Sequence, residues 1–533
     1  TPKFRSHPSG LSRNLLGQLE NLSQKEKSTE LTPNEKIKLF RSLFKTRDDV
    51  YARKWKNKEK IGYSPVKTYT GDYLPLTDEV IKYHLQGINP KEPLHYGQKR
   101  DFIVGVYPLL KNENCNFLAV DFDAKHTNSD WKAEVKAFID TCKTLNINAY
   151  IEISRSGMGA HIWIFFETEI TAVNARKLGS LILTLAMENN PNISFKTYDR
   201  FFPNQDTMPK GGLGNLIALP LQKRAREENK TVFVNENFVP YQDQWLFLLS
   251  VKKVPEVQIN SILKTYRELE LKNNFYDEND TEPWKLTNKD DFTNIKLPEN
   301  IKIILANKIY IEKENLPPKL INKFLKMAAF QNPEFYRTQA MRFSTYDKPR
   351  IIACGDILPK HIAIPRGCLD ELSAFCEKNK ITIELRDKRL KGKKIKASFQ
   401  GKLKDEQSKA YKELIEKDFG ILSAPTAFGK TVLASKIISK RKVSTLILVH
   451  RKQLAAQWKQ KLKEFLNIEA GIIGGGKNKP AGIIDIAIMQ SLIKQENSAE
   501  FLSNYAQLIV DECHHLAAYK FDKLQKSLEE NMF

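Results

Sequence analysis

The feature that most constrains this chain is a pair of motifs near its end. Residues 420–431 read GILSAPTAFGKT, and residues 507–515 read QLIVDECHH. The first motif predicts a buried strand, a loop of small residues and then a helix through residues 432–438, which is the context of a phosphate-binding loop. The second predicts an apolar strand that ends in two carboxylates. We therefore expect a nucleotide-binding α/β lobe over this part of the chain.

Each polar side chain of these two motifs has an expected role at a bound nucleotide. Backbone N–H groups of the loop receive the phosphates, Lys430 offsets their charge, and the Thr431 hydroxyl ligates magnesium. Asp511 holds the same ion through water, and Glu512 polarises the attacking water. A strand that ends in Asp-Glu is weak evidence by itself, because such carboxylates often cap the next helix. The phosphate loop earlier in the chain is the reason to assign them a role at a nucleotide. The expected nucleotide contacts in the loop are Ala424, Pro425, Thr426, Gly429, Lys430 and Thr431.

The order of the neighbouring segments resembles that of superfamily 2 helicases. Residues 446–454 (LILVHRKQL) and 485–492 (DIAIMQSL) resemble the motifs that touch the nucleic-acid backbone, and residues 399–407 (FQGKLKDEQ) resemble the segment whose glutamine reads adenine. The resemblance implies that Gln407 has this role and that the lobe is RecA-like, with a parallel sheet. It also implies a second lobe that supplies arginine fingers. We read the chain as ending before that lobe, and expect it to bind ATP, hydrolyse it poorly and unwind nothing.

Composition indicates the class of partner. The chain has 85 Lys and Arg against 63 Asp and Glu, a net charge of +22, and such a surplus favours a polyanion. DNA, as a single strand or a primed template, is the expected partner, with RNA as a second candidate; a merely solubilising surface charge is the alternative. The six cysteines form no CxxC pair, and no apolar run reaches the roughly 20 residues of a membrane span. We expect a cytoplasmic protein with no membrane partner.

The chain of 533 residues is too long for one core, so several domains are expected. Short apolar strands alternate with helical stretches between about residues 70 and 250, as in an α/β or α+β catalytic domain. We expect a polar helical leader over residues 1–60, a catalytic domain over 61–266, a linker over 267–295, a small mixed domain with a basic hairpin over 296–398, and the nucleotide-binding lobe over 399–533.

Two carboxylates mark the candidate site of the N-terminal domain. In residues 117–123 (FLAVDFD), the side-chain period of a strand places Asp121 and Asp123 on one face. Two carboxylates on one face are able to share divalent metals, although a strand end that faces water gives the same pattern. Further along, Trp163 and Phe165 alternate with isoleucines, and we interpret both rings as core rather than as base-stacking surfaces.

A strand, a turn and a second strand follow the carboxylates. Residues 152–163 read EISRSGMGAHIW, in which the Ser/Arg/Gly turn is able to accept phosphate and His161 opens the second strand. This order of motifs resembles the archaeo-eukaryotic primase family, whose third motif is a hydrophobic residue followed by Asp, here Tyr198 and Asp199. The resemblance implies that Asp121, Asp123 and Asp199 bind two Mg²⁺ or Mn²⁺ ions and that His161, Ser156 and Arg155 contact an incoming NTP or dNTP. Asp206 competes with Asp199 for the third metal role.

A more specific resemblance covers roughly residues 40–533. Residues 201–206 (FFPNQD), 211–222 (GGLGNLIALPLQ), 329–335 (AFQNPEF) and 364–368 (IPRGC) resemble the primase-helicase proteins of TOTE conflict systems. The expected fold is therefore a multidomain α/β chain, with a primase-like α+β domain followed by a RecA-like parallel-sheet lobe. The resemblance implies a primase-polymerase joined to an ATP-dependent helicase or translocase.

Two other functions remain open at this point. In the first, the chain is an ATP-dependent DNA translocase whose primase-like domain only binds nucleic acid. In the second, the N-terminal domain is a nuclease, because acidic pairs also hold metals for hydrolysis. The SGxGxH segment disfavours the nuclease, since hydrolysis needs no grip on a triphosphate.

Overall fold

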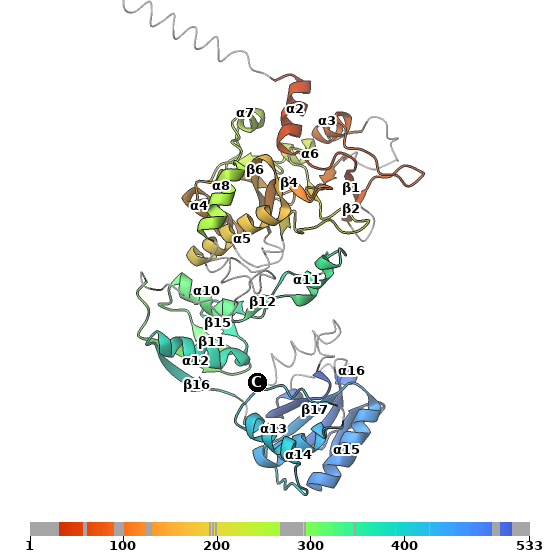
Figure 1. The fold of residues 1–533 in the computed structure, drawn as a ribbon, viewed down its shortest axis with the longest axis vertical. Helices are drawn as coiled ribbons and strands as arrows, with labels where there is room; N and C mark the ends of the chain where they lie inside the picture. Colours follow the sequence, from red (N-terminus) through yellow and green to blue (C-terminus); the bar gives the residue numbers. More distant parts are fainter. Residues whose placement is uncertain are drawn as a thin grey trace, which may run out of the picture. The chain divides into compact units, whose positions relative to one another are not determined.

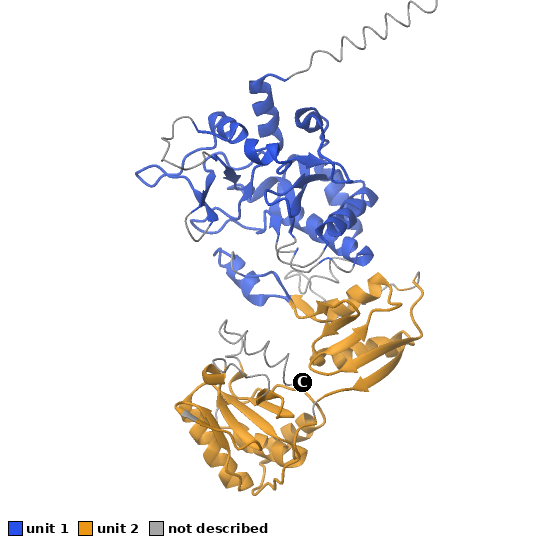
Figure 2. Cartoon of the chain, turned by 180° about the vertical axis from the view of Figure 1, so that it is seen from behind, with its two compact units in different colours: residues 1–288, 331–352 blue, residues 289–330, 353–533 orange. Residues whose placement is uncertain are grey.

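The computed structural model describes most of the chain, which divides into two compact units (Figure 2). One unit comprises residues 1–288 and 331–352, and the other comprises residues 289–330 and 353–533. Of the expected linker, only residues 292 and 295 are described. The described residues are 31–56, 61–89, 101–123, 130–190, 193, 197, 200–266, 292, 295–345, 348–389, 391–425, 427–492 and 501–513.

An antiparallel five-stranded sheet in the order β7-β4-β6-β5-β9 forms the centre of the first unit. Helices α4 (Trp131–Thr144) and α5 (Ala172–Asn189) cover one face of this sheet (Figure 1). On that face the rings of Phe122 and Phe138 pack with centroids 5.6 Å apart. The alternation predicted for residues 117–123 is thereby confirmed. The strands are β4 (Asn114–Asp123), β5 (Tyr150–Ile153), β6 (Gly159–Thr171), β7 (Phe201–Phe202) and β9 (Phe233–Val234).

The other face of the sheet carries a buried aromatic cluster that includes a residue next to helix α2 (Pro33–Leu43). Phe44 follows the helix and packs edge-on against Trp163 and Phe165, both fully buried. The interpretation of these two rings as core is confirmed. Helix α2 lies within the stretch 1–60 that was expected as a leader, and its buried residues Ile37, Phe40 and Leu43 pack into this core. The remaining helices are α6 (Lys223–Glu227), α7 (Gln244–Leu249) and α8 (Glu256–Thr265).

A second sheet of this unit, in the order β2-β1-β3-β8, shares the same core through helix α3 (Asp78–Gln86). His84 of α3 is fully buried: its Nδ1 accepts the Val104 N–H at 3.1 Å, and its Nε2 lies 2.9 Å from the Pro220 carbonyl oxygen. The ring is therefore neutral, with its proton on Nε2, and burial lowers the pKa of His84 to about 4. The strands are β1 (Ala52–Lys56), β2 (Ile61–Pro65), β3 (Val104–Val106) and β8 (Ile217–Ala218).

The buried, neutral His84 predicts a loss of stability in mild acid. The unfolded chain takes up a proton near pH 6.5, whereas the folded chain does so only near pH 4, so the contribution is present above 6.5 and is lost as the pH falls. We expect His84 to account for about 2 kcal/mol of the fall in unfolding free energy between pH 7 and pH 5. Urea unfolding of the wild type and of His84→Gln at both pH values measures it. Equal pH dependence of the two proteins would contradict the assignment.

The second unit contains two separate sheets. The first, in the order β14-β15-β11-β10-β16, packs helices α10 (Pro318–Met327) and α12 (Leu369–Lys378) against its apolar side chains. The basic segment expected as a hairpin, residues 386–396, begins in the last strand of this sheet. Its residues 393–395 bond to the backbone of residues 442–444 instead of folding back on the segment itself, so the described residues do not form the expected hairpin. The strands are β10 (Asn300–Leu305), β11 (Ile309–Glu312), β14 (Asp356–Ile357), β15 (His361–Ile364) and β16 (Thr382–Asp387).

The other sheet, in the order β19-β18-β20-β17-β21, is parallel except for β19, which confirms the expected RecA-like lobe. Helices α14 (Lys430–Arg441) and α15 (Lys452–Leu466) pack on one face and α16 (Met489–Leu492) on the other. None of the helices that the structure describes is both long and apolar enough to cross a membrane. The further elements are α13 (Asp405–Ile415), β17 (Thr445–Val449), β18 (Gly471–Gly474), β19 (Lys477–Lys479), β20 (Ile484–Ile488) and β21 (Gln507–Val510).

The strand predicted before the phosphate loop is absent among the described residues of that segment. Residues 420–425 form no ladder, and Ile421 is 73% exposed. A buried strand needs a partner, yet β21 is the edge of the sheet and pairs only with β17. The prediction of a buried strand was therefore wrong, whereas the helix after the loop is present and begins at Lys430.

Candidate active sites

The two predicted carboxylates of the first unit share one face of the central sheet with the predicted histidine. In the register of β4 and β6, Asp121 lies opposite His161 and Asp123 lies opposite Gly159. A side chain at position 159 would place its Cβ 2.3 Å from the Phe122 carbonyl oxygen, so only glycine permits this pairing. The structure thus brings Asp121, Asp123 and His161 together at one end of the strands.

His161 lies between two carboxylates. Its Nε2 is 3.8 Å from Asp121 Oδ1, and its Nδ1 is 3.1 Å from Glu152 Oε2. Burial alone lowers the pKa of His161, but the charge and hydrogen bond of Glu152, together with Asp121 and Asp123, raise it to about 9. A positively charged imidazole at this position suits contact with a phosphate oxygen.

Arg200 is a site residue that the sequence did not reveal. Its guanidinium Nη1 lies 3.2 Å from Asp121 Oδ2, and its backbone oxygen accepts the Asp121 N–H at 3.1 Å. These contacts follow from the pairing of β7 with β4. Asp199, the expected third metal ligand, directly precedes Arg200 in the sequence but lies outside the described residues.

The predicted phosphate turn is held by residues from distant parts of the sequence. The Arg155 guanidinium forms an ion pair with Asp101 at 2.6 Å and donates to the Gln222 side chain at 3.3 Å. Gln222, fully buried, donates in turn to Asp101 at 2.6 Å. The Ser156 hydroxyl accepts the Met158 N–H at 3.1 Å and so fixes the turn. Asp101 and Gln222 had no signal in the sequence, because their partners depend on tertiary contacts.

Asp206, the competing third ligand, is bound by other side chains. Its carboxylate pairs with Arg176 at 2.6 Å and accepts from Gln339 at 2.9 Å. Burial raises the pKa of Asp206, but Arg176, Arg350 and Gln339 outweigh it, and the net pKa is lowered. Gln339 belongs to helix α11 (Pro333–Ala340), in the segment that leaves and re-enters the second unit through β12 (Ala329–Gln331) and β13 (Ile351–Ala353). These contacts favour an anchoring role for Asp206 over metal binding.

Removal of the Asp206 carboxylate is expected to destabilise the first unit. Asp206→Ala leaves the Arg176 guanidinium, 8% exposed, buried without its counter-charge, which costs about 3 kcal/mol of unfolding free energy. Denaturant unfolding measures it, with Glu236→Ala as the control: the exposed pair Lys143–Glu236 contributes less than about 1 kcal/mol. Equal stability of the two variants would argue against the anchor.

The donor set of the first site suits a hard divalent cation. Asp121 and Asp123 offer carboxylate oxygens, which are the ligands that Mg²⁺ and Mn²⁺ prefer. Within the described residues, no group of three or more His, Cys, Asp or Glu side chains is arranged to hold a metal. The two aspartates therefore fit as part of a metal site whose third predicted ligand, Asp199, is not described.

The phosphate loop of the second unit is fixed by Gln407. This side chain is 4% exposed, donates to the Phe428 carbonyl oxygen at 2.6 Å and accepts the Lys404 N–H at 2.9 Å. Gly429 caps α14 with a φ of 89°, and a Cβ there would lie 2.5 Å from Gln407 Nε2. Gln407 thus holds the loop next to Lys430, which opens the helix together with Thr431. Ala424 and Pro425 precede the loop without regular structure, and Thr426 lies outside the described residues.

Asp511 and Glu512 follow β21, as predicted. Asp511 Oδ2 accepts the indole N–H of Trp458 at 2.8 Å, and its backbone N–H donates to the Leu448 oxygen at 3.0 Å. Glu512 adopts a left-handed φ of 53° at the turn after the strand. Trp458 of α15 was not anticipated, because nothing in its segment marks a partner for the carboxylate.

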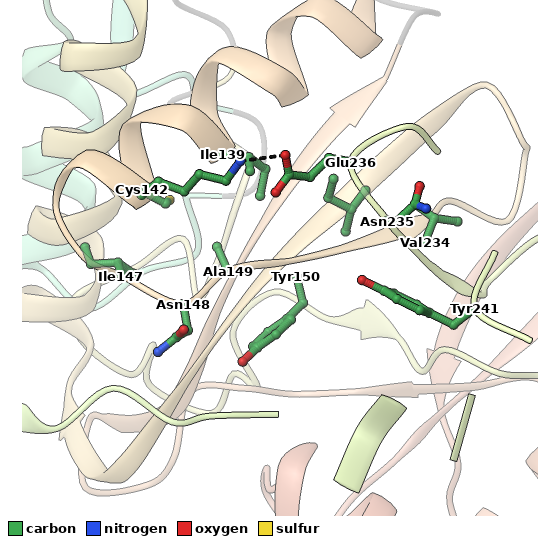
Figure 3. Close-up of a pocket in the computed structure, with 12 residues that line it drawn as sticks. Ile139, Cys142, Ile147, Asn148, Ala149, Tyr150, Val234, Asn235, Glu236 and Tyr241 are labelled. Carbon is green, nitrogen blue, oxygen red and sulfur yellow. Dashed lines mark hydrogen bonds and ion pairs between the residues drawn. The ribbon is translucent and has the colours of Figure 1, made fainter. Parts of the chain in front are cut away.

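A cavity of about 250 Å³ lies elsewhere in the first unit (Figure 3). It opens between the end of α4, β5 and β9, and the ion pair Lys143–Glu236 spans it. None of the predicted site residues lines it. Its described lining residues are Ile139, Cys142, Lys143, Ile147, Asn148, Ala149, Tyr150, Ile151, Val234, Asn235, Glu236 and Tyr241.

The two ends of the chain match different known proteins. Residues 400–533 match the family model of the type III restriction enzyme res subunit. The chain is 40% identical over 114 residues to the DNA 3′-5′ translocase XPB2 of Sulfurisphaera tokodaii, and 27% identical over 222 residues to the probable helicase D10 of Escherichia phage T5. These alignments cover 21% and 42% of this chain, and 25% and 45% of the two relatives.

The N-terminal part matches a different model. Residues 35–262 match the archaeo-eukaryotic primase domain of the TOTE conflict system, a stretch that contains the carboxylate pair, His161 and the phosphate turn. The resemblance inferred from the motifs is thus confirmed at both ends. The chain thus joins a stretch that matches the TOTE archaeo-eukaryotic primase domain to a stretch that matches the type III restriction enzyme res subunit.

Proposed function

We propose that the first unit is a primase-polymerase, which joins NTPs or dNTPs to a primer strand on a DNA template. The observation that carries this proposal is the shared face of Asp121, Asp123 and His161, at which two carboxylates of the kind that hold divalent metals adjoin an imidazole. A nuclease needs the carboxylates but no grip on a triphosphate, which the phosphate turn beside them would supply. The match to a primase domain supports the same choice.

Each residue of the site has its own role in the proposed nucleotidyl transfer. Asp121, Asp123 and Asp199 would hold Mg²⁺ or Mn²⁺, which when bound activates the primer 3′-hydroxyl and neutralises the triphosphate. His161 and Arg155 bind the phosphate oxygens and orient the α-phosphate toward that hydroxyl, with Ser156 fixing the turn that carries Arg155. Arg200 holds the Asp121 carboxylate in place.

We propose further that the second unit binds ATP and hydrolyses it slowly, as the first lobe of a motor that moves along or opens DNA. Lys430 and Thr431, at the N-terminus of α14, would hold the β- and γ-phosphates and magnesium. Asp511 would hold the same ion through water, and Glu512 would polarise the attacking water. Gln407 supports the loop and reads adenine. The translocase name of one relative and the net charge of +22 support a DNA partner. RNA stays the second candidate substrate, and a cytoplasmic location is part of the proposal.

A primer-extension assay tests the first proposal. The purified chain is incubated with a primed single-stranded DNA template, labelled NTPs or dNTPs, and Mg²⁺ or Mn²⁺. Extension with one nucleotide class preferred is the expected result, and it also identifies the substrate. Template binding without extension under either metal would overturn the proposal. That result would favour a translocase whose primase-like domain only binds nucleic acid, which is the second candidate because basic side chains adjoin the site.

A further inference from the structure

Glu152 is a buried carboxylate with two hydrogen-bonded neighbours. It is 1% exposed, and in the register of β5 and β6 it lies directly opposite His161. Its Oε2 lies 3.1 Å from His161 Nδ1 and accepts the indole N–H of Trp163 at 2.7 Å. Burial of a carboxyl group is costly unless its partners compensate it, and these two contacts offset the burial of Glu152.

The strand register explains why the His161 ring turns one nitrogen toward Glu152 and the other toward Asp121. His161 is flanked by Glu152 on β5 and by Asp121 on β4, so the three side chains lie in a row on one face of the sheet. With Nδ1 turned to Glu152, Nε2 faces the Asp121 side, where its distance to Oδ1 is 3.8 Å. If the ring rotated by half a turn, Nδ1 instead of Nε2 would face the Asp121 side.

We propose that Glu152 is a positioning residue: it fixes the orientation of the His161 ring so that Nε2 is presented on the carboxylate side to the incoming nucleotide. The identity of the ligand in this inference rests on the proposed function, whereas the contact between Glu152 and His161 is independent of it. An anchor of this kind matters because an imidazole that is held at one nitrogen keeps its ring direction. A purely structural role, satisfying the Trp163 N–H, is the competing explanation.

The two explanations separate in a pair of variants. Trp163→Phe removes the indole N–H and leaves Glu152 with His161 alone. Adding Glu152→Met, of similar length and flexible, then removes the anchor of His161 without stranding a buried indole. Glu152→Gln is the conservative variant, since its amide oxygen is able to accept the same hydrogen bonds.

The decisive measurement is the nitrogen NMR signal of the His161 ring in the full chain labelled with ¹⁵N-histidine, assigned by its loss in His161→Gln. At a pH low enough to keep the ring protonated in every variant, we expect the Nδ1 signal to shift in the Glu152→Met/Trp163→Phe variant relative to Trp163→Phe. We expect it to stay near the wild-type pattern in Glu152→Gln, which keeps the hydrogen-bond acceptor. Unchanged ring signals in the double variant would overturn the proposal. This readout does not need catalysis, so it remains decisive if the chain fails to extend primers.

Nucleotide affinity measures the consequence. We expect the apparent KM for the nucleotide to rise roughly tenfold in Glu152→Met/Trp163→Phe relative to Trp163→Phe, as for the loss of one oriented hydrogen bond, and Glu152→Gln to restore it. A rise of the same size in Trp163→Phe alone would assign the effect to core packing and overturn the positioning role.

Discussion

Primer extension is expected to fall by roughly a thousandfold or more when Asp121 and Asp123 are both replaced by alanine. The two carboxylates share one face of β4, so no neighbouring group replaces them when both are lost. The effect is expected on kcat more than on template binding, because removing negative charge near a basic surface does not weaken DNA contacts. Steady-state extension rates and template affinity, measured together, check both parts of this expectation.

The matched control is a second pair of carboxylates in the same sheet. Glu167 and Glu169 lie two residues apart on β6, outside the site, and Glu169 pairs with Lys45 at 3.2 Å. Glu167→Ala/Glu169→Ala changes the net charge by the same amount and should leave extension within about twofold of the wild type, as most surface substitutions do. Extension that survives in Asp121→Ala/Asp123→Ala would place the catalytic metals elsewhere.

Replacement of Lys430 with alanine is expected to weaken ATP binding by roughly a hundredfold, the effect of losing a charge-assisted contact to phosphate. Lys430 is the first residue of α14, directly after the left-handed Gly429, so its side chain leaves the helix at the end where phosphates bind. A fluorescent ATP analogue titrated into the full chain measures the affinity without requiring turnover.

Lys440→Ala serves as the control for this second expectation. Lys440 lies in the last turn of the same helix and is exposed, so its loss removes equal charge far from the N-terminus of α14. We expect its ATP affinity to match that of the wild type. Equal affinities for Lys430→Ala and the wild type would show that the exposed loop is not a phosphate site.

The carboxylate pair could be predicted because it depends only on the period of a strand, and β4 obeys that period. The partners of the predicted residues could not be. Asp101 and Gln222 reach Arg155 from 54 and 67 residues away, and Gln339 reaches Asp206 across 133 residues. Local patterns carry no information on such contacts, which depend on how the sheets and helices pack.

Before the phosphate loop, by contrast, a local pattern predicted a strand that the described residues do not form. Its apolar residues have the composition of a buried strand, yet composition cannot supply the neighbouring strand that a ladder needs. Ile421 is accordingly exposed. The helix after the loop was predicted correctly, because a helix completes its own hydrogen bonds and needs no partner in sequence-distant segments.

The course of residues 331–352 bears on how such proteins are inherited. The primase-domain match ends at residue 262, but α11 and its contact with Asp206 come from beyond residue 330, after the chain has already entered the second unit. The chain therefore passes from one unit to the other more than once. A recombination event that exchanged everything beyond residue 288 would take Gln339 away from Asp206 and leave Arg176 as its partner. An exchange that preserves both contacts therefore keeps residues 331–352 together with the first unit.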